Sequence, residues 1–288
     1  MSINLLIQKV KEKSNPTVVG LDPFIENFPQ DILKKYPIPD AILAFNKDII
    51  DAVADIVPAV KPQAAFYEQY GWQGFRALEE TVKYAKSKGL YVILDGKRND
   101  IGSTAEGYAK AYLTEDGMNA DALTVNGYLG FDGIKPFLDT GRAIFVLAKT
   151  SNPSSGDVQN RRLDDGKTVY ETVAELCAEW GAGSPCGGVA VPYNNVGIVV
   201  GATYPEQIAE LREKLPRTFF LIPGYGAQGG KAEDIAKAFD KDGLGAIVNA
   251  SRSILYAWKN TGGDYQDAAR AEAIKMRDDI TGKLEINP

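Results

Sequence analysis

Histidine is absent from the 288-residue sequence, and cysteine occurs only twice. Without histidine the chain has no Ser-His-Asp triad, no Cys-His pair, no histidine general base and no metal site built on imidazole. Cys177 and Cys186 are too few for a disulfide framework or a thiolate metal site, so we interpret them as buried thiols in a reducing compartment. Acid–base and electrostatic chemistry must then come from Asp, Glu, Lys, Tyr or the backbone.

Long apolar runs and an excess of positive charge are also missing. The first apolar stretch is interrupted by Gln8 and Lys9, which is too early for a signal peptide, and no segment approaches the roughly 18 apolar residues of a membrane span. The net charge is −6 at pH 7. A nucleic-acid-binding surface needs concentrated basic charge. We therefore expect a cytoplasmic protein with no membrane and no nucleic-acid partner.

Eight short apolar runs alternate with segments of helical spacing. This alternation is typical of βα units that build a parallel sheet. Most of the runs are apolar almost throughout, as expected for strands that are covered on both faces. The predicted strands are residues 17–22, 58–64, 90–97, 120–126, 143–149, 196–201, 218–223 and 245–250.

The segments between the runs are amphipathic. Ile42, Phe45, Ile49 and Val53, for example, are spaced to share one helix face. Eight strands that alternate with helices favour a (β/α)₈ TIM barrel over an open doubly wound sheet, and no linker suggests a second domain. We predict an α/β fold in which residues 1–288 form a single (β/α)₈ barrel. A helix over residues 3–11 is expected to close its bottom, and a helix over residues 265–280 to be the eighth outer helix.

Two long connections depart from this simple alternation. Residues 150–166 are a polar, turn-rich segment after the fifth predicted strand, and residues 181–195 are an irregular entry to the sixth. Long loops in compact domains are often functional, although a disordered surface excursion is an alternative. The sequence leaves the role of residues 150–166 open.

Charged residues gather at the ends of the first three predicted strands. In a (β/α)₈ barrel the active site lies at the C-terminal ends of the strands. Because side chains alternate along a strand, Asp95 and Lys97 point the same way, into the barrel mouth. A single charge there could be merely solvated, but carboxylates and ammonium groups that converge on one mouth indicate a preorganised charged site. The set is Asp22, Lys61, Asp95, Lys97 and Asp100.

The neighbouring aspartates restrict what the lysines can do. A lysine that forms a Schiff base must be neutral to attack a carbonyl, whereas a lysine flanked by aspartates stays protonated. We therefore interpret Lys97 as a fixed cation and proton donor, suited to a developing carbanion, and not as a nucleophile.

A second candidate site follows the seventh and eighth strands, where barrels of this kind commonly bind phosphate. The segment PGYGAQGG, residues 223–230, contains four glycines that allow backbone amides to approach an anion. Arg252, within NASRSI, can bind a phosphate with a forked pair of donors. A glycine-rich loop alone is more often only a turn, but together with Arg252 it predicts phosphate binding.

The segment DGKRNDIGST, residues 95–104, resembles the D-x-K-x-x-D-[IV]-x-x-T signature of the orotidine 5′-phosphate decarboxylase family. The resemblance covers nearly the whole chain. It extends to GLDP at 20–23, VKPQ at 60–63, AKTSNP at 148–153, VVGAT at 199–203, PGYGAQGG and NASRSI. With the long loop after the fifth strand, the combination is similar to the longer bacterial branch of the family.

The resemblance implies a reaction in pyrimidine synthesis, the loss of CO₂ from orotidine 5′-phosphate to give uridine 5′-phosphate, with no metal and no cofactor. It implies that Lys97 stabilises and then protonates C6 of the pyrimidine and that Asp95 lies against the departing carboxylate. Lys61 would bind ribose hydroxyls and hold the aspartates, and Asp100 would complete the catalytic set. Asp100, Ile101 and Thr104 would reach into the site of a neighbouring subunit, which implies a homodimer.

The remaining candidate residues would bind the substrate. By the resemblance Asp22 contacts the ribose, Ser151 the pyrimidine amide, and Gln228 both base and phosphate. Asn126 ends the fourth predicted strand and is either a further site residue or a helix N-cap, and Ser154 or Ser155 could replace Ser151. The substrate-binding set is Asp22, Ile101, Thr104, Asn126, Ser151, Gln228 and Arg252, and the phosphate-binding set is Gln228, Gly229, Gly230 and Arg252.

Two other functions fit parts of the pattern. A magnesium-dependent sugar-phosphate decarboxylase or epimerase of the same barrel group shares D-x-K-x-x-D, but it carries an acidic metal ligand where this chain has Lys61, which would repel Mg²⁺. A noncatalytic phosphate- or nucleotide-binding protein should have lost a member of the charged set, yet Lys61, Asp95, Lys97 and Asp100 are all present. The decarboxylase is therefore favoured.

Overall fold

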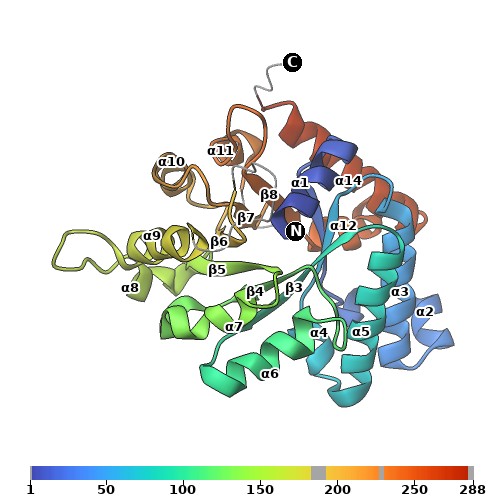
Figure 1. The fold of residues 1–288 in the computed structure, drawn as a ribbon. Coiled ribbons are helices and arrows are strands. Elements are labelled where there is room, and N and C mark those ends of the chain that lie inside the picture. The colour runs from blue at the N-terminus through green and yellow to red at the C-terminus, as the bar shows by residue number, and fades with distance from the viewer. Residues whose placement is uncertain (1, 183–192, 227–229, 285–288) are drawn as a thin grey trace.

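The computed structural model describes residues 2–182, 193–226 and 230–284, and in this part of the chain eight parallel strands close into a barrel in sequence order (Figure 1). The predicted (β/α)₈ architecture is confirmed, and each of the eight predicted strands overlaps an observed one. The strands are β1 (Thr17–Leu21), β2 (Ala59–Pro62), β3 (Tyr91–Arg98), β4 (Ala122–Val125), β5 (Ala143–Lys149), β6 (Val196–Val200), β7 (Phe220–Pro223) and β8 (Ala246–Ala250).

The helices surround the barrel (Figure 1). Helix α3 (Ile38–Val53) buries the predicted stripe of Ile42, Phe45, Ile49 and Val53, and it packs against α5 (Gly71–Ser87) and α14 (Tyr265–Thr281). The main outer helices are α3 (Ile38–Val53), α5 (Gly71–Ser87), α6 (Gly102–Leu113), α9 (Val169–Ala182), α10 (Pro205–Lys214) and α14 (Tyr265–Thr281). Shorter segments are η1 (Ile25–Asn27), α2 (Gln30–Lys35), α4 (Ala65–Glu68), η2 (Gly127–Leu129), η3 (Phe131–Gly133), α7 (Lys135–Leu138), η4 (Pro153–Ser155), α8 (Gly156–Gln159), α11 (Ala232–Ala236), α12 (Arg252–Leu255) and α13 (Trp258–Thr261).

The N-terminal helix closes the bottom of the barrel, as predicted. This helix, α1 (Ser2–Lys13), buries Ile3 and Leu6 among the side chains that fill the barrel interior, such as Tyr91 and Phe145. A separate and larger apolar cluster fills the space between the barrel and the outer helices. The barrel interior is therefore a packed core and not a pore. The barrel is open at the C-terminal ends of its strands.

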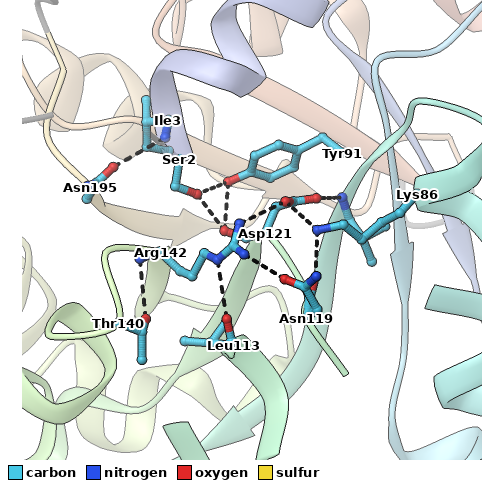
Figure 2. Close-up of polar contacts among 11 residues, drawn as sticks. Ser2, Ile3, Lys86, Tyr91, Leu113, Asn119, Asp121, Thr140, Arg142 and Asn195 are labelled. Atoms are coloured by element: carbon cyan, nitrogen blue, oxygen red, sulfur yellow. Dashed lines mark hydrogen bonds and ion pairs between the residues drawn. The ribbon is translucent and has the colours of Figure 1, made fainter. Parts of the chain in front are cut away.

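A buried polar network fixes α1 at this lower end (Figure 2). The Ser2 hydroxyl bonds the backbone oxygen of Asp121 and lies 2.7 Å from the hydroxyl of Tyr91. The carboxylate of Asp121 pairs with Lys86 at 2.8 Å and with Arg142 at 3.4 Å. Asp121 immediately precedes β4, so the network lies at the strand N-termini, the stabilising end of such barrels and not the catalytic one.

The two long connections have different outcomes. Residues 150–166 contain η4 and α8, followed by an isolated bridge between Arg162 and Thr168, so this segment is ordered structure and not a disordered excursion. Most of residues 181–195, including Cys186, lies outside the described residues.

Cys177 is buried in α9, and burial raises the pKa of its thiol. No helix in the described ranges is long and apolar enough to cross a bilayer.

Candidate active site

A cavity of about 490 Å³ opens at the C-terminal ends of the strands. Its volume is within the usual range for a small-molecule site. Six of the predicted site residues line it, contributed by five different strand ends: Asp22, Lys61, Asp95, Lys97, Ser151 and Arg252. Residues more than 200 positions apart in the sequence therefore meet in one cavity, as the barrel topology predicts.

Asp95 is the centre of the charged cluster. Its Oδ2 accepts hydrogen bonds from Lys61 Nζ at 2.7 Å and from Gln63 Nε2 at 3.0 Å. Its Oδ1 accepts from Lys97 Nζ at 2.6 Å and from Thr124 Oγ1 at 2.8 Å. Both oxygens are therefore occupied, and one buried carboxylate holds two ammonium groups in fixed positions.

The charges of this cluster are maintained at neutral pH. Burial by itself raises the pKa of Asp95, which is only 7% exposed, but the ammonium groups of Lys61 and Lys97 outweigh burial and hold its pKa well below the usual range. Burial by itself lowers the pKa of Lys61, which is 3% exposed, but Asp95 and Asp22 outweigh it and raise that pKa. Asp95 is therefore a carboxylate and Lys61 an ammonium ion at neutral pH, as expected from the sequence.

A backbone irregularity directs Lys97 toward the cavity. Its φ is +48°, a left-handed conformation that is uncommon and costly for a residue other than glycine. The pairing of β3 with β4 shifts register between Leu94 and Arg98, and the Lys97 amide donates to Thr124 Oγ1 at 3.0 Å. Simple strand alternation thus placed Lys97 on the correct side, but a bulge and a side-chain hydrogen bond fix its direction.

Two buried acceptors in the cavity have no donor in the described part of the chain. They are Oδ1 of Asp22 and Oδ1 of Asn249. A buried acceptor without a partner costs about 1–3 kcal/mol. The close packing around Asn249 depends on Gly20, because a Cβ there would lie 1.9 Å from Ser251 Oγ and 3.1 Å from Asn249 Oδ1. The arrangement fits a ligand that brings hydroxyl or N–H donors.

The predicted phosphate end of the cavity is partly described. Arg252 is the first residue of α12 and lines the cavity beside Gly224 and Tyr225. The hydroxyl of Tyr225 donates to Asp279 of α14 at 3.1 Å, which ties this loop to the last helix. Gly230 is buried just beyond it, and Gln228 and Gly229 lie outside the described residues.

Five predicted residues in the described part of the chain do not line this cavity, namely Asp100, Ile101, Thr104, Asn126 and Gly230. Asp100 accepts a hydrogen bond from the amide of Ile101 at 2.8 Å, and Ile101 and Thr104 are exposed at the start of α6. Asn126 is exposed and accepts from the amide of Tyr128 at 3.0 Å, so it caps η2. Of the two roles considered for Asn126, the structure shows the helix cap, and the residue does not line the cavity.

The structure also distinguishes among the three serines that could contact the pyrimidine amide. Ser151 lines the cavity, whereas Ser154 is exposed and Ser155 is buried against Lys149. The favoured candidate, Ser151, therefore has the better position.

Sequence reasoning missed several polar lining residues, among them Gln63, Thr124, Gln159 and Asn249. A period-two pattern could have found Gln63, which is two residues after Lys61, but nothing local marks Gln159. Within the described ranges no group of three or more acidic or cysteine side chains could hold a metal ion. The polar side chains that line the cavity offer hydrogen bonds and fixed charges.

Comparisons with known proteins agree with this geometry. A family model described as the orotidine 5′-phosphate decarboxylase / HUMPS family matches residues 18–263. The orotidine 5′-phosphate decarboxylase of Rhodopirellula baltica is 46% identical over 92% of this chain and 94% of its own, and that of Caldicellulosiruptor bescii is 42% identical over 97% of each chain.

Solved structures give the same result. The OMP decarboxylase of Leishmania donovani is 32% identical, with a TM-score of 0.78 over 98% of this chain and 99% of that one. A putative orotidine-monophosphate decarboxylase of Toxoplasma gondii is 30% identical, with a TM-score of 0.83 over 98% of this chain and 97% of that one. Fold, charged cluster and relatives agree, and the chain belongs to the orotidine 5′-phosphate decarboxylase / HUMPS family.

Proposed function

We propose that this protein decarboxylates orotidine 5′-phosphate to uridine 5′-phosphate and CO₂, a step of pyrimidine biosynthesis. The observation that carries the proposal is the Lys61–Asp95–Lys97 cluster, in which one buried carboxylate positions an ammonium group at the rim of a nucleotide-sized cavity. The curated relatives that share this chain's length carry the same activity in their names. A preorganised cation is suited to a reaction that develops a carbanion.

The proposed reaction uses these groups in sequence. The bond between C6 and the substrate carboxylate breaks, the electron pair stays on C6, and CO₂ departs next to Asp95. The Lys97 ammonium stabilises the developing charge and then transfers a proton to C6, after which the neutral amine regains a proton from solvent. Asp95 and Lys61 keep Lys97 in place, so little reorganisation is needed when the charge develops.

Binding energy far from C6 supports the same step. We propose that Asp22 and Lys61 bind the ribose, that Ser151 binds the pyrimidine amide, and that Arg252 with Gln228, Gly229 and Gly230 binds the phosphate. The donor-free Oδ1 of Asp22 fits a ribose hydroxyl. Contacts to the phosphate can lower the barrier at C6 when they become strongest in the transition state.

The metal-dependent alternative within the same barrel group is disfavoured by Lys61. Its ammonium is buried and bonded to Asp95 at 2.7 Å, at the strand end where a metal-dependent relative needs an acidic ligand. The test is the ultraviolet absorbance of orotidine 5′-phosphate incubated with purified protein, with and without EDTA. Rapid conversion to uridine 5′-phosphate that EDTA leaves unchanged is expected, and no conversion by folded protein would contradict the proposal.

Arg252→Ala is expected to raise the KM for orotidine 5′-phosphate about 100-fold with a smaller change in kcat, since a charged hydrogen bond contributes about 1.5–3 kcal/mol. Arg252 begins α12 at the cavity and has no buried role in the fold. Steady-state kinetics measure the effect, and binding of uridine, which lacks the phosphate, is the control. Equal weakening of uridine and uridine 5′-phosphate binding would show that Arg252 does not bind the phosphate.

We propose that the protein is a homodimer in which Asp100 and Thr104 complete the partner's site. Four large apolar side chains are exposed near Asp100: Ile101, Tyr128, Leu129 and Phe131. Tyr128 is 87% exposed, and α6 packs against η3, so the exposed side chains belong to neighbouring segments. Exposed apolar patches of this kind mark protein interfaces.

Mixing two inactive variants tests the shared site. Lys97→Ala and Asp100→Ala should each be inactive alone. Random exchange of equal amounts makes about half of the dimers mixed, and each mixed dimer has one site with both native residues, so about a quarter of wild-type activity should return. No recovery after verified subunit exchange would place Asp100 in its own chain's site or outside the site.

We also propose that residues 1–288 act as a single domain and that the protein works in the cytoplasm. The support for the location is chemical, because a phosphorylated nucleotide does not cross a bilayer unaided. Cell fractionation with an activity assay tests it.

A further inference from the structure

Lys149, the last residue of β5, is a buried cation that the proposed mechanism does not use. It is 1% exposed. Its Nζ donates to Ser155 Oγ at 3.1 Å and to Asn160 Oδ1 at 2.9 Å. The ammonium also lies 4.4 Å from the ring centre of Tyr204. No ion pair of Lys149 is found among the described residues, so neutral oxygens and aromatic rings hold this charge.

A buried ammonium without a carboxylate is costly unless its hydrogen bonds are well satisfied. Both acceptors of Lys149 come from the connection after β5: Ser155 ends η4, and Asn160 follows α8. The charge therefore draws residues 150–160 back onto the strand from which they leave. An apolar residue at position 149 would remove this donor from both acceptors and would leave Ser155 Oγ with the Tyr204 hydroxyl, 3.2 Å away.

The same segment forms part of the cavity wall. Gln159 accepts a hydrogen bond from the amide of Thr150 at 2.9 Å and donates to the Thr150 hydroxyl at 2.7 Å. Thr150, Ser151, Asn152 and Gln159 all line the cavity. Gln159 is adjacent to Asn160, so the residue that closes the segment on itself is next to the residue that binds Lys149.

Gly201, which directly follows β6, packs closely against the start of residues 150–160. The amide of Gly201 donates to the backbone oxygen of Lys149 at 2.8 Å. A Cβ at Gly201 would lie 2.9 Å from Cβ of Ser151, so only glycine allows this approach without a shift. Ser151 thus has a position that depends on how residues 149–160 are held.

We propose that Lys149 is a positioning residue whose buried ammonium folds residues 150–160 into one wall of the cavity and thereby places Ser151 against the pyrimidine. The kinetic part of this inference rests on the proposed function, and the structural part does not. It gives the long connection after β5 a role, which is to carry substrate contacts and not to serve as a surface excursion.

Three variants test the inference. Asn160→Ala removes one acceptor at a position that is exposed, and Asn160→Asp keeps an acceptor of the same size. We expect Asn160→Ala to lower kcat/KM about 10-fold, mainly through KM, and Asn160→Asp to remain within about 3-fold of wild type. Lys149→Met, which removes the ammonium, should lower kcat/KM about 100-fold. Asp157→Asn, at an exposed position in the same segment, is the control and should match wild type.

Amide hydrogen exchange in the free protein separates this inference from the proposed function. In wild type the Thr150 amide should be protected by Gln159, and Asn160→Ala should lose protection over residues 150–160 alone. If wild type exchanges as expected but has no decarboxylase activity, the proposed function fails and the positioning role survives. Unchanged exchange and wild-type kinetics in both Asn160→Ala and Lys149→Met, or equal damage in Asn160→Ala and Asn160→Asp, would overturn the positioning role.

Discussion

Replacing Lys97 with alanine is expected to lower kcat at least about 10⁴-fold, because one substitution removes both the proton donor and the cation that stabilises the carbanion. The Lys97 side chain is half exposed at the cavity rim, and among the described residues its ammonium bonds to Asp95 alone, at 2.6 Å, so the fold should tolerate its loss. Uridine 5′-phosphate should still bind, since the ribose and phosphate contacts remain. Single-turnover kinetics and calorimetric titration measure the two effects.

The control for this prediction is Lys110→Ala, which removes a lysine from the exposed face of α6 and should leave turnover unchanged. Turnover in Lys97→Ala within about 10-fold of wild type would contradict the mechanism. Loss of both turnover and nucleotide binding would instead assign Lys97 a role in holding the substrate.

Asp95→Asn should reduce both stability and activity. The substitution keeps the size of the side chain but removes the charge that compensates Lys61 and Lys97, and breaking a buried ion pair typically costs about 3–5 kcal/mol. The free energy of unfolding from denaturant titration should fall by about that amount, and kcat should fall at least about 100-fold because Lys97 loses its anchor. Asp116→Asn, at an exposed position, is the control.

The stability effect of Asp95 has a defined pH dependence. The pKa of Asp95 in the folded protein lies below its unfolded value of about 3.9. Its contribution is therefore fully present above the unfolded pKa and is lost as the pH falls through the folded pKa. The difference in unfolding free energy between wild type and Asp95→Asn should be constant from about pH 5 to pH 8 and should shrink below about pH 4. A difference that grows in acid would contradict the ion-pair interpretation.

The fold could be predicted from sequence because each strand is marked by a local run of apolar and β-branched residues. Residues 143–149, AIFVLAK, are one such run. Between the runs, apolar residues recur with the 3.6-residue period of a helix. The charged cluster followed from a single topological rule, that strand C-termini meet at one end of a barrel. Asp95, Lys97 and Lys61 were identified in this way.

The remaining site features depend on tertiary contacts, which cannot be inferred from a local sequence pattern. Lys149 is a cation that belongs to the cavity wall only because Ser155 and Asn160 fold back onto it. The direction of Lys97 depends on a left-handed φ and on the hydrogen bond that its backbone amide donates to Thr124 Oγ1. The strand-end rule alone could not assign Asn126, because an asparagine after a strand can also cap a helical turn, as it does here.

The most direct test of the central claim, that Lys97 delivers the proton to C6, is hydrogen exchange at C6 of uridine 5′-phosphate in D₂O, followed by proton NMR. If Lys97 protonates the carbanion, microscopic reversibility requires that the same amine removes that proton from the product. We expect wild type to replace the C6 hydrogen with deuterium and Lys97→Ala to leave it in place. Absence of exchange in wild-type protein that decarboxylates normally, or equal exchange in Lys97→Ala, would contradict the assignment of Lys97.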